Sequence, residues 1–177
     1  MKKYQYNCID ESILLPYLKK YVFGVLHRMV PYGVPANFLT LTSIFIMWSI
    51  LIYFLNIKEV RSGAVLAATI SIILYVIFDH FDGLQAKKTQ TSSPLGEFLD
   101  HFSDVFNAAI IIYLFFRSLQ VELDDYFLLV LWFNFLAFGV TFMEQRERQE
   151  LYFGKFGTLE GIVLVLLILV SCISIQG

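Results

Sequence analysis

The chain has 177 residues, of which 58% are hydrophobic and 16% are charged, and its formal net charge is −2 at pH 7. Its mean hydropathy of +0.67 is too high for a protein with an ordinary water-soluble surface. The composition therefore excludes a soluble globular protein and places the chain in a lipid bilayer.

The N-terminal segment, Ile9 to Val30, carries apolar residues at helical spacing. Its basic residues are Lys19, Lys20, His27 and Arg28. This pattern predicts an amphipathic helix that lies along an anionic leaflet. The helix would serve as an anchor, or as a lid or lateral gate for lipid, and the pattern leaves both open. We divide the chain into an interfacial helix over residues 1–34 and a transmembrane domain over residues 35–177.

Five nearly uncharged runs follow, each about as long as the ~20 residues that cross a ~30 Å hydrocarbon layer. They are Phe38 to Leu55, Ala64 to Phe81, Phe98 to Phe116, Tyr126 to Met143 and Leu159 to Ile175. These runs are continuously apolar, whereas the strands of a membrane β-barrel alternate between apolar and polar residues. We therefore predict an all-α membrane protein, a polytopic helical bundle of five to six spans.

The loops between the spans carry unequal numbers of basic residues, and the cytoplasmic loops of helical membrane proteins are the richer in Lys and Arg. One side would hold Lys2, Lys3, Lys19, Lys20, Arg28, Lys87, Lys88, Arg146, Arg148 and Lys155. The other side would hold Lys58, Arg61 and Arg117. Ten basic residues against three predict a multi-pass protein whose N-terminus and acidic region face the cytoplasm.

Four aspartates distinguish the stretch from Phe78 to Asp104 from an ordinary helical bundle. Asp79 and Asp82 are three residues apart, and Asp100 and Asp104 are four apart, so each pair shares one face of a helix. We expect a loop from Gly83 to Pro94 that makes the two helices antiparallel neighbours. The four carboxylates would then face one another at one depth.

Carboxylates gathered in this way repel one another, by about 4 kcal/mol for a pair ~4 Å apart at an effective dielectric near 20. Divalent cations remove that repulsion. Ligands that are all oxygen suit Mg²⁺ or Mn²⁺ rather than zinc. We predict two Mg²⁺ ions, with Mn²⁺ as an alternative, held by Asp79, Asp82, Asp100 and Asp104. Two-metal sites of this kind favour displacement at phosphorus.

Small and basic residues surround the acids. Gly83, Ala86 and Gly96 would let helix backbones and a ligand approach closely. Lys87 and Lys88 add the positive charge that a pyrophosphate requires.

These residues resemble the CDP-alcohol phosphotransferase family, whose pattern is Asp-x-x-Asp-Gly-x-x-Ala-Arg, a spacer of eight, and Gly-x-x-x-Asp-x-x-x-Asp. Every spacing matches, with Lys87 where Arg is usual. The stretch SSPLGEFLDH from Ser92 to His101 is similar to the choline and ethanolamine phosphotransferase branch. Further similarity to that branch lies at Pro35, Asn37, Thr40, Glu144, Leu151 to Gly154, Glu160 and Gly161. The family core has six spans, and Phe142 stands where the branch tends to carry His.

The resemblance implies roles for individual residues. The four aspartates would bind metal, and Asn37 and Lys87 would contact the CDP-alcohol. Gly83, Ala86 and Gly96 would shape the nucleotide pocket, and Asp79 belongs to the same binding set. His101 or Asp104 would take the acceptor proton; His suits a base near neutral pH, and both remain candidates. We expect a structural role for His80, which lies between two ligand aspartates and points off their face.

The resemblance also implies a reaction: attack by an alcohol on the donor phosphate, with CMP leaving. One version joins a CDP-alcohol of the choline or ethanolamine type to a diacylglycerol-like hydroxyl in phospholipid synthesis. The other uses CDP-diacylglycerol with a small polyol, a phosphorylated polyol or serine. The expected partners are these substrates and the membrane, not nucleic acid, and a homodimer is compatible with the resemblance. A divalent-cation transporter and a silent metal-binding scaffold are the alternatives from other classes.

Overall fold

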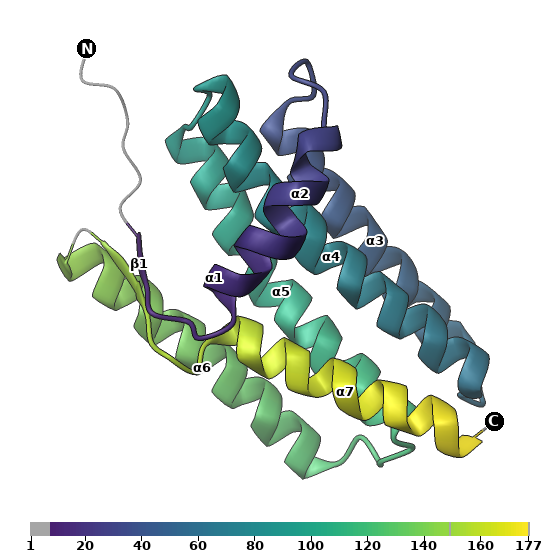
Figure 1. The fold of residues 1–177 in the computed structure, drawn as a ribbon. Coiled ribbons are helices and arrows are strands. Elements are labelled where there is room, and N and C mark those ends of the chain that lie inside the picture. Colours follow the sequence, from purple (N-terminus) through teal and green to yellow (C-terminus); the bar gives the residue numbers. More distant parts are fainter. Residues whose placement is uncertain (1–7, 149, 177) are drawn as a thin grey trace.

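The computed structural model describes residues 8–148 and 150–176. Five helices of this part are long and apolar enough to cross a membrane, which confirms the predicted all-α polytopic bundle. They are α3 (Ala36–Asn56), α4 (Ser62–Thr89), α5 (Pro94–Ser118), α6 (Asp125–Arg148) and α7 (Thr158–Gln176) (Figure 1).

Helix lengths locate the acidic residues along the bundle. The 21 residues of α3 span about 31 Å at 1.5 Å per residue, close to the hydrocarbon thickness. The 28 residues of α4 span about 42 Å, so α4 is longer than that layer is thick. Asp79 is 17 residues past Ser62, or about 26 Å along the axis. The acidic residues of α4 therefore lie near one edge of the apolar layer.

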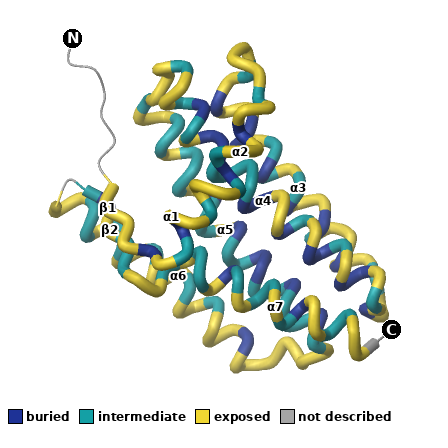
Figure 2. The backbone as a smooth tube through the Cα atoms, in the orientation of Figure 1, coloured by how far each residue is buried: buried dark blue, intermediate teal, exposed yellow. Residues whose placement is uncertain are grey.

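Helix α4 is the centre of the bundle. It packs against α3 on one side and α7 on the other, while α5 packs against α3 and α6. Buried side chains concentrate on α3, α4 and α5, where Met47, Phe54, Ile72 and Leu114 are fully enclosed. Helix α6 is peripheral, with Phe127 as its one buried residue among those described (Figure 2).

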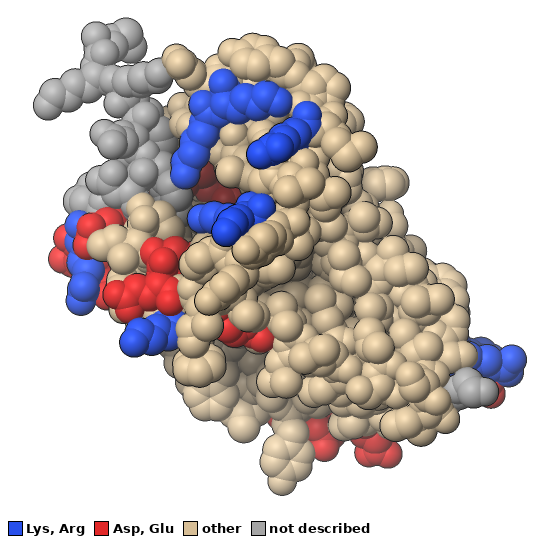
Figure 3. Space-filling view, in the orientation of Figure 1, with Lys and Arg blue, Asp and Glu red and all other residues tan. Residues whose placement is uncertain are grey.

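Charged residues lie toward the two ends of the bundle. Figure 3 shows Lys and Arg gathered over the upper part of the view, a few charges at the opposite end, and a broad uncharged surface between them. At the lower end, Arg117 Nη2 donates to the carbonyl of Ile57 at 3.0 Å, which ties α5 to the loop between α3 and α4. A bundle with charged residues at its ends and an apolar surface in the middle is typical of a membrane-spanning protein.

The expected loop from Gly83 is wrong. Helix α4 continues through Gly83 to Thr89 and ends at Gln90, which adopts the left-handed conformation with φ of 59°. The residues after Gly83 are strong helix formers, and one glycine costs only ~1 kcal/mol in a helix. The connection to α5 therefore shrinks to residues 90–93, and Ser93 caps α5 by accepting from Gly96 N–H at 3.1 Å.

The N-terminal segment is helical from Leu15 to Met29, not from Ile9. It runs through α1 (Leu15–Leu18), the π-helical turn η1 (Lys19–Phe23), α2 (Gly24–Leu26) and the 3-10 turn η2 (His27–Met29). Gly24 is needed there, because a Cβ would come within 2.6 Å of the carbonyl oxygen of Lys19. Lys2 and Lys3 lie outside the described residues.

Residues Cys8–Asp10 form strand β1, which pairs in parallel with β2 (Leu151–Phe153) in a two-stranded sheet. This sheet was not predicted, because three-residue strands carry too little pattern to be recognised and their partners are far apart in the chain. It places the start of the N-terminal segment beside the connection from α6 to α7 (Figure 1).

Candidate active site

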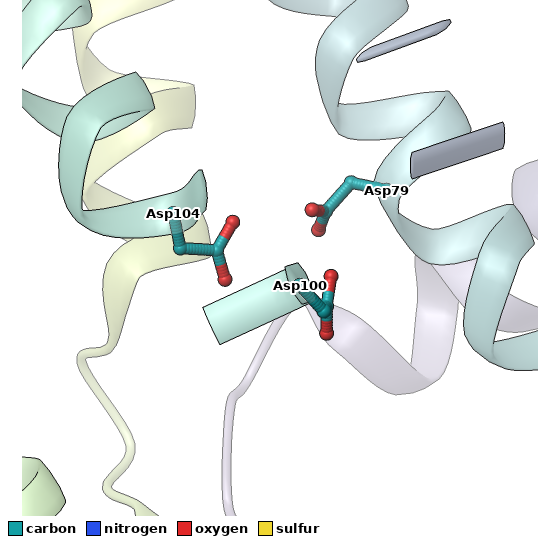
Figure 4. Close-up of side chains that lie close together, drawn as sticks. All are labelled: Asp79, Asp100 and Asp104. Carbon is teal, nitrogen blue, oxygen red and sulfur yellow. The ribbon is translucent and has the colours of Figure 1, made fainter. Parts of the chain in front are cut away.

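Three of the predicted metal-binding aspartates meet between α4 and α5. Asp79 comes from α4, and Asp100 and Asp104 come from successive turns of α5. Each offers a carboxylate oxygen, and the three oxygens lie within 4.8 Å of one another, directed into one space (Figure 4). The spacing of four residues on α5 produces this convergence, because it keeps Asp100 and Asp104 on one face.

Asp82 is the fourth predicted ligand and is oriented differently. Its Oδ2 accepts a hydrogen bond of 2.6 Å from the hydroxyl of Thr40 on α3, and the side chain is buried. Asp82 nevertheless lines the same cavities as Asp100. The structure thus gathers three carboxylates, with Asp82 held alongside them by α3.

The donor set fits a divalent cation. Its ligand atoms are carboxylate oxygens, as hard cations such as Mg²⁺ prefer. Asp100 Oδ1 is buried and has no hydrogen-bond donor among the described residues. A buried, unpaired carboxylate oxygen is costly unless a cation or donor satisfies it. The three half-buried acids therefore supply both the ligands and the charge that a cation would neutralise.

A cavity of about 100 Å³ lies on one side of the acids, between the start of α3, the end of α4 and the start of α5. Its lining includes five predicted donor-binding residues: Asn37, Gly83, Ala86, Lys87 and Gly96. Gly96 is tightly placed, because a Cβ there would come within 3.2 Å of Asn37 Oδ1. The sequence pattern and the cavity thus select the same residues.

A second cavity, of about 250 Å³, lies on the other side and is lined by all four aspartates and His101. A third, of about 310 Å³, extends from His101 and Asp104 toward α6 and is lined by Phe138, Phe142 and other aromatic residues. His101 and Asp104, the two candidate bases, therefore border both the cavity that holds the acids and the cavity lined with aromatic side chains.

The histidines beside the acids have aromatic neighbours. The His101 ring stacks on Phe142 of α6, with ring centroids 6.0 Å apart. The His80 ring stacks on Phe23 of η1 at 4.2 Å, and its Nδ1 lies 2.9 Å from the carbonyl oxygen of Val76. His80 thus packs against the N-terminal segment.

Two contacts at the site were missed from sequence. The hydroxyl of Tyr75 donates to Asp104 Oδ1 at 2.8 Å, and Gln145 Nε2 donates to Glu97 Oε1 at 2.8 Å. Tyr75 lies four residues before Asp79, so the two side chains share one face of α4. That spacing could have identified Tyr75 as a neighbour of the acids. The bond from Gln145 joins α6 to α5 and has no local signature.

Comparison with known proteins agrees with the geometry. A family model described as CDP-alcohol phosphatidyltransferase matches residues 34–176, most of the chain. The chain belongs to this family. The predicted resemblance is thereby confirmed.

Individual members of this family match the chain over nearly its whole length. A CDP-alcohol phosphatidyltransferase class-I family protein of Schizosaccharomyces pombe, itself uncharacterized, is 32% identical over 174 residues, covering 94% of this chain and 45% of the relative. Choline/ethanolaminephosphotransferase 1 of Saccharomyces cerevisiae is 29% identical over 172 residues, covering 93% and 44%. Cholinephosphotransferase 1 of Gallus gallus is 24% identical over 183 residues, covering 97% and 53%. The chain thus spans about half the length of these CDP-alcohol phosphatidyltransferase relatives.

Proposed function

We propose that this protein is a membrane enzyme that transfers a phospho-alcohol group from a CDP-alcohol of the choline or ethanolamine type to a diacylglycerol-like hydroxyl, releasing CMP. The observation that supports this most is the meeting of Asp79, Asp100 and Asp104 between a cavity lined by Asn37 and Lys87 and one lined by His101. The names of two relatives, choline/ethanolaminephosphotransferase and cholinephosphotransferase, support this donor.

In this proposal the donor occupies the cavity between the start of α3, the end of α4 and the start of α5. Asn37 and Lys87 contact the CDP-alcohol, and Gly83, Ala86 and Gly96 leave room for it. Lys87 would act as a point charge on a phosphate, without the two-pronged grip that Arg provides.

The four aspartates would hold the divalent cations, Asp79, Asp100 and Asp104 directly and Asp82 through the carboxylate oxygen that does not bond to Thr40. Cations bound there would offset the negative charge of the leaving phosphate. Two hydroxyl groups fix the orientation of two of these carboxylates. Tyr75 donates a hydrogen bond to Asp104, and Thr40 donates one to Asp82. Mg²⁺ is the proposed ion, and Mn²⁺ has the same ligand preference.

The reaction forms a bond from the acceptor oxygen to the phosphorus next to the donor alcohol and breaks the bond from that phosphorus to the CMP oxygen. The acceptor proton goes to His101 or Asp104, which border the same two cavities. His101 is the better base, since a carboxylate that binds a cation is a weak one. The aromatic cavity beside His101 would accommodate the apolar part of the acceptor.

Residues 1–34 would form the interfacial helix and residues 35–177 the transmembrane domain, with the N-terminus and active site at the cytoplasmic face. The start of the matched region at residue 34 supports that boundary. A homodimer is compatible with the peripheral, exposed face of α6.

The test is CMP release by purified protein in lipid with Mg²⁺. CDP-choline or CDP-ethanolamine with diacylglycerol is compared with CDP-diacylglycerol plus a panel of polyols, phosphorylated polyols and serine. Asp100→Asn should abolish release, while Asp125→Asn, the same change on an exposed residue of α6, should leave it unchanged. Release from CDP-diacylglycerol alone would assign the lipid to the donor. No release from any donor would contradict the proposal, and cation flux in proteoliposomes would then test the transporter.

A further inference from the structure

The first described residues form a strap across the candidate site. We use this name for residues 8–19, which include β1, α1 and the first residue of η1. At one end β1 pairs with β2, and Glu11 N–H extends the pairing by donating to the carbonyl oxygen of Phe153 at 2.9 Å. Tyr152 adds a hydrogen bond of 3.2 Å to Glu11 Oε2, which raises the pKa of that tyrosine.

One carboxylate fastens the strap to the bundle. Glu160, in the first turn of α7, accepts at Oε1 from the hydroxyl of Ser12 at 2.5 Å and from Leu14 N–H at 3.2 Å. Its Oε2 accepts from Gly157 N–H at 2.9 Å, which fixes the carboxylate to its own loop. Hydrogen bonds to a charged acceptor are stronger than those between neutral groups. Glu160 therefore joins segments that are 148 residues apart in the chain.

The fastened strap is a wall of the cavity that holds the aspartates. Ser12, Leu15 and Lys19 line that cavity together with Asp79, Asp82, Asp100, Asp104 and His101. Ser12 and Leu15 are each 6% exposed, so the strap is packed in place rather than lying loosely over the opening. Beyond it, Phe23 stacks on His80, and His27 Nε2 bonds to Gln85 Oε1 at 3.0 Å.

We propose that Glu160 is a positioning residue that holds the strap closed, and that the closed strap keeps water from competing with the acceptor hydroxyl. Water is the obvious rival, because its attack on the same phosphorus would convert CDP-alcohol and water into CMP and the free phospho-alcohol. Closing an active site to exclude water prevents such side reactions. This inference rests on the transferase activity proposed above.

The strap is expected to respond to changes at Glu160. Glu160→Ala removes the acceptor for both Ser12 and Leu14, and each net hydrogen bond shifts an equilibrium by about fivefold. The open fraction of the strap should then rise by about 25-fold. Ser12→Ala, which removes one of these bonds, should have a smaller effect in the same direction.

The decisive readout is the ratio of CMP released to lipid product formed in one reaction. We expect a ratio near one for the unaltered protein, and a rise of about fivefold or more for Glu160→Ala. Glu59→Ala removes the same charge from an exposed residue that is ion-paired with Arg61, and should leave the ratio unchanged. A variant that merely folds poorly would lose both products in proportion. An unchanged ratio in active Glu160→Ala protein would overturn the inference.

A second measurement needs no activity. In a Cys8→Ser, Cys172→Ser background, Leu15→Cys places a thiol at a buried strap position, and its rate of labelling by a water-soluble maleimide reports opening. Adding Glu160→Ala should accelerate labelling about 10-fold or more; equal rates would overturn the inference. Absence of CMP release from the unaltered protein would instead count against the transferase, so the two failures are distinguishable.

Discussion

At the scale of single residues, the carboxylates of the site differ in how they are supported. Asp104 accepts a hydrogen bond from Tyr75, and Asp82 accepts one from Thr40, whereas Asp100 Oδ1 is buried with no donor among the described residues. Hydroxyl donors behind a ligand fix its orientation, and their loss typically lowers metal affinity or activity by 10- to 100-fold. Tyr75 and Thr40 are therefore expected to matter for metal binding or activity.

Replacing Tyr75 by Phe removes the hydroxyl and keeps the buried ring. We expect the Mg²⁺ concentration for half-maximal CMP release to rise by about 10-fold or more, because Asp104 loses its orienting donor. A Mg²⁺ titration of activity measures this. Tyr53→Phe, at an exposed ring on α3, is the matched control and should give the curve of the unaltered protein. Identical curves for both variants would show that Tyr75 is only a packing residue.

Lys87 is the second residue with a direct test. Lys87→Met should raise the KM for the CDP-alcohol by about 10-fold or more, since a hydrogen bond to a charged group contributes about 1.5–3 kcal/mol. Lys87→Arg should lower the KM by about threefold, because Arg can grip phosphate with two bonds. Steady-state kinetics with varied donor measure both. Lys58→Met, on an exposed residue at the other end of the bundle, should change neither KM nor kcat.

Metal removal is expected to abolish activity and to destabilise the fold. Without cations, carboxylates about 4 Å apart repel one another by about 4 kcal/mol per pair at an effective dielectric near 20. Thermal unfolding in detergent should therefore shift to lower temperature on chelation and recover with Mg²⁺. In Asp100→Asn protein the shift should be smaller, because one charge is gone. A melting temperature that is unchanged by chelation would contradict metal binding by this cluster.

At the scale of elements, α4 both supplies ligands and anchors the N-terminal segment. Gln85 is fully buried on α4, and its Nε2 donates to the carbonyl oxygens of Pro31 at 2.9 Å and Val34 at 2.8 Å. Its Oε1 lies 3.0 Å from His27 Nε2. One side chain thus fixes the turn that leads into α3, on which Asn37 and Thr40 lie.

Replacing Gln85 by Leu should destabilise the protein by on the order of 3 kcal/mol, because the carbonyls and the imidazole are left buried without partners. Denaturant unfolding in detergent would measure the loss. The comparison is Asn56→Leu, at an exposed residue whose Nδ2 bonds to Ile52 in the same helix, where we expect a change within about 0.5 kcal/mol. Equal stability of the two variants would mean that the turn before α3 does not depend on Gln85.

At the scale of the whole molecule, the helices run up and down, so the connections alternate between two ends (Figure 1). The connection from α4 to α5 lies at the end with the candidate site, and the connection from α3 to α4 lies at the other. The excess of Lys and Arg at the first end favours a cytoplasmic location for it.

Cysteine labelling in intact cells tests this orientation. In a Cys8→Ser, Cys172→Ser background, Lys58→Cys should react with a membrane-impermeant maleimide added outside, and Lys88→Cys should react only after permeabilisation. Both positions are exposed, so access rather than burial decides the result. The reverse pattern would place the site outside the cytoplasm.

Much of the fold could be predicted because it depends on local composition. The five spans follow from runs of apolar residues, and the acids follow from their spacing on one face. The prediction failed in two kinds of place: where a contact links distant segments, and where a glycine lies in a strongly helical stretch. Three-residue strands such as β1 gain their partner only in the folded chain, and the helix through Gly83 to Thr89 was obscured by a glycine that a strongly helical neighbourhood tolerates.

The sequence by itself determined that this protein is a helical membrane protein of the CDP-alcohol phosphatidyltransferase family, since hydropathy and motif spacing are properties of short stretches. Only the tertiary structure decided that Asp82 turns to Thr40, that Tyr75 reaches Asp104, and that Glu160 fastens the strap over the acids. Each of these contacts joins different elements of the chain. Their distance and direction arise from how helices pack, which no local pattern of residues specifies.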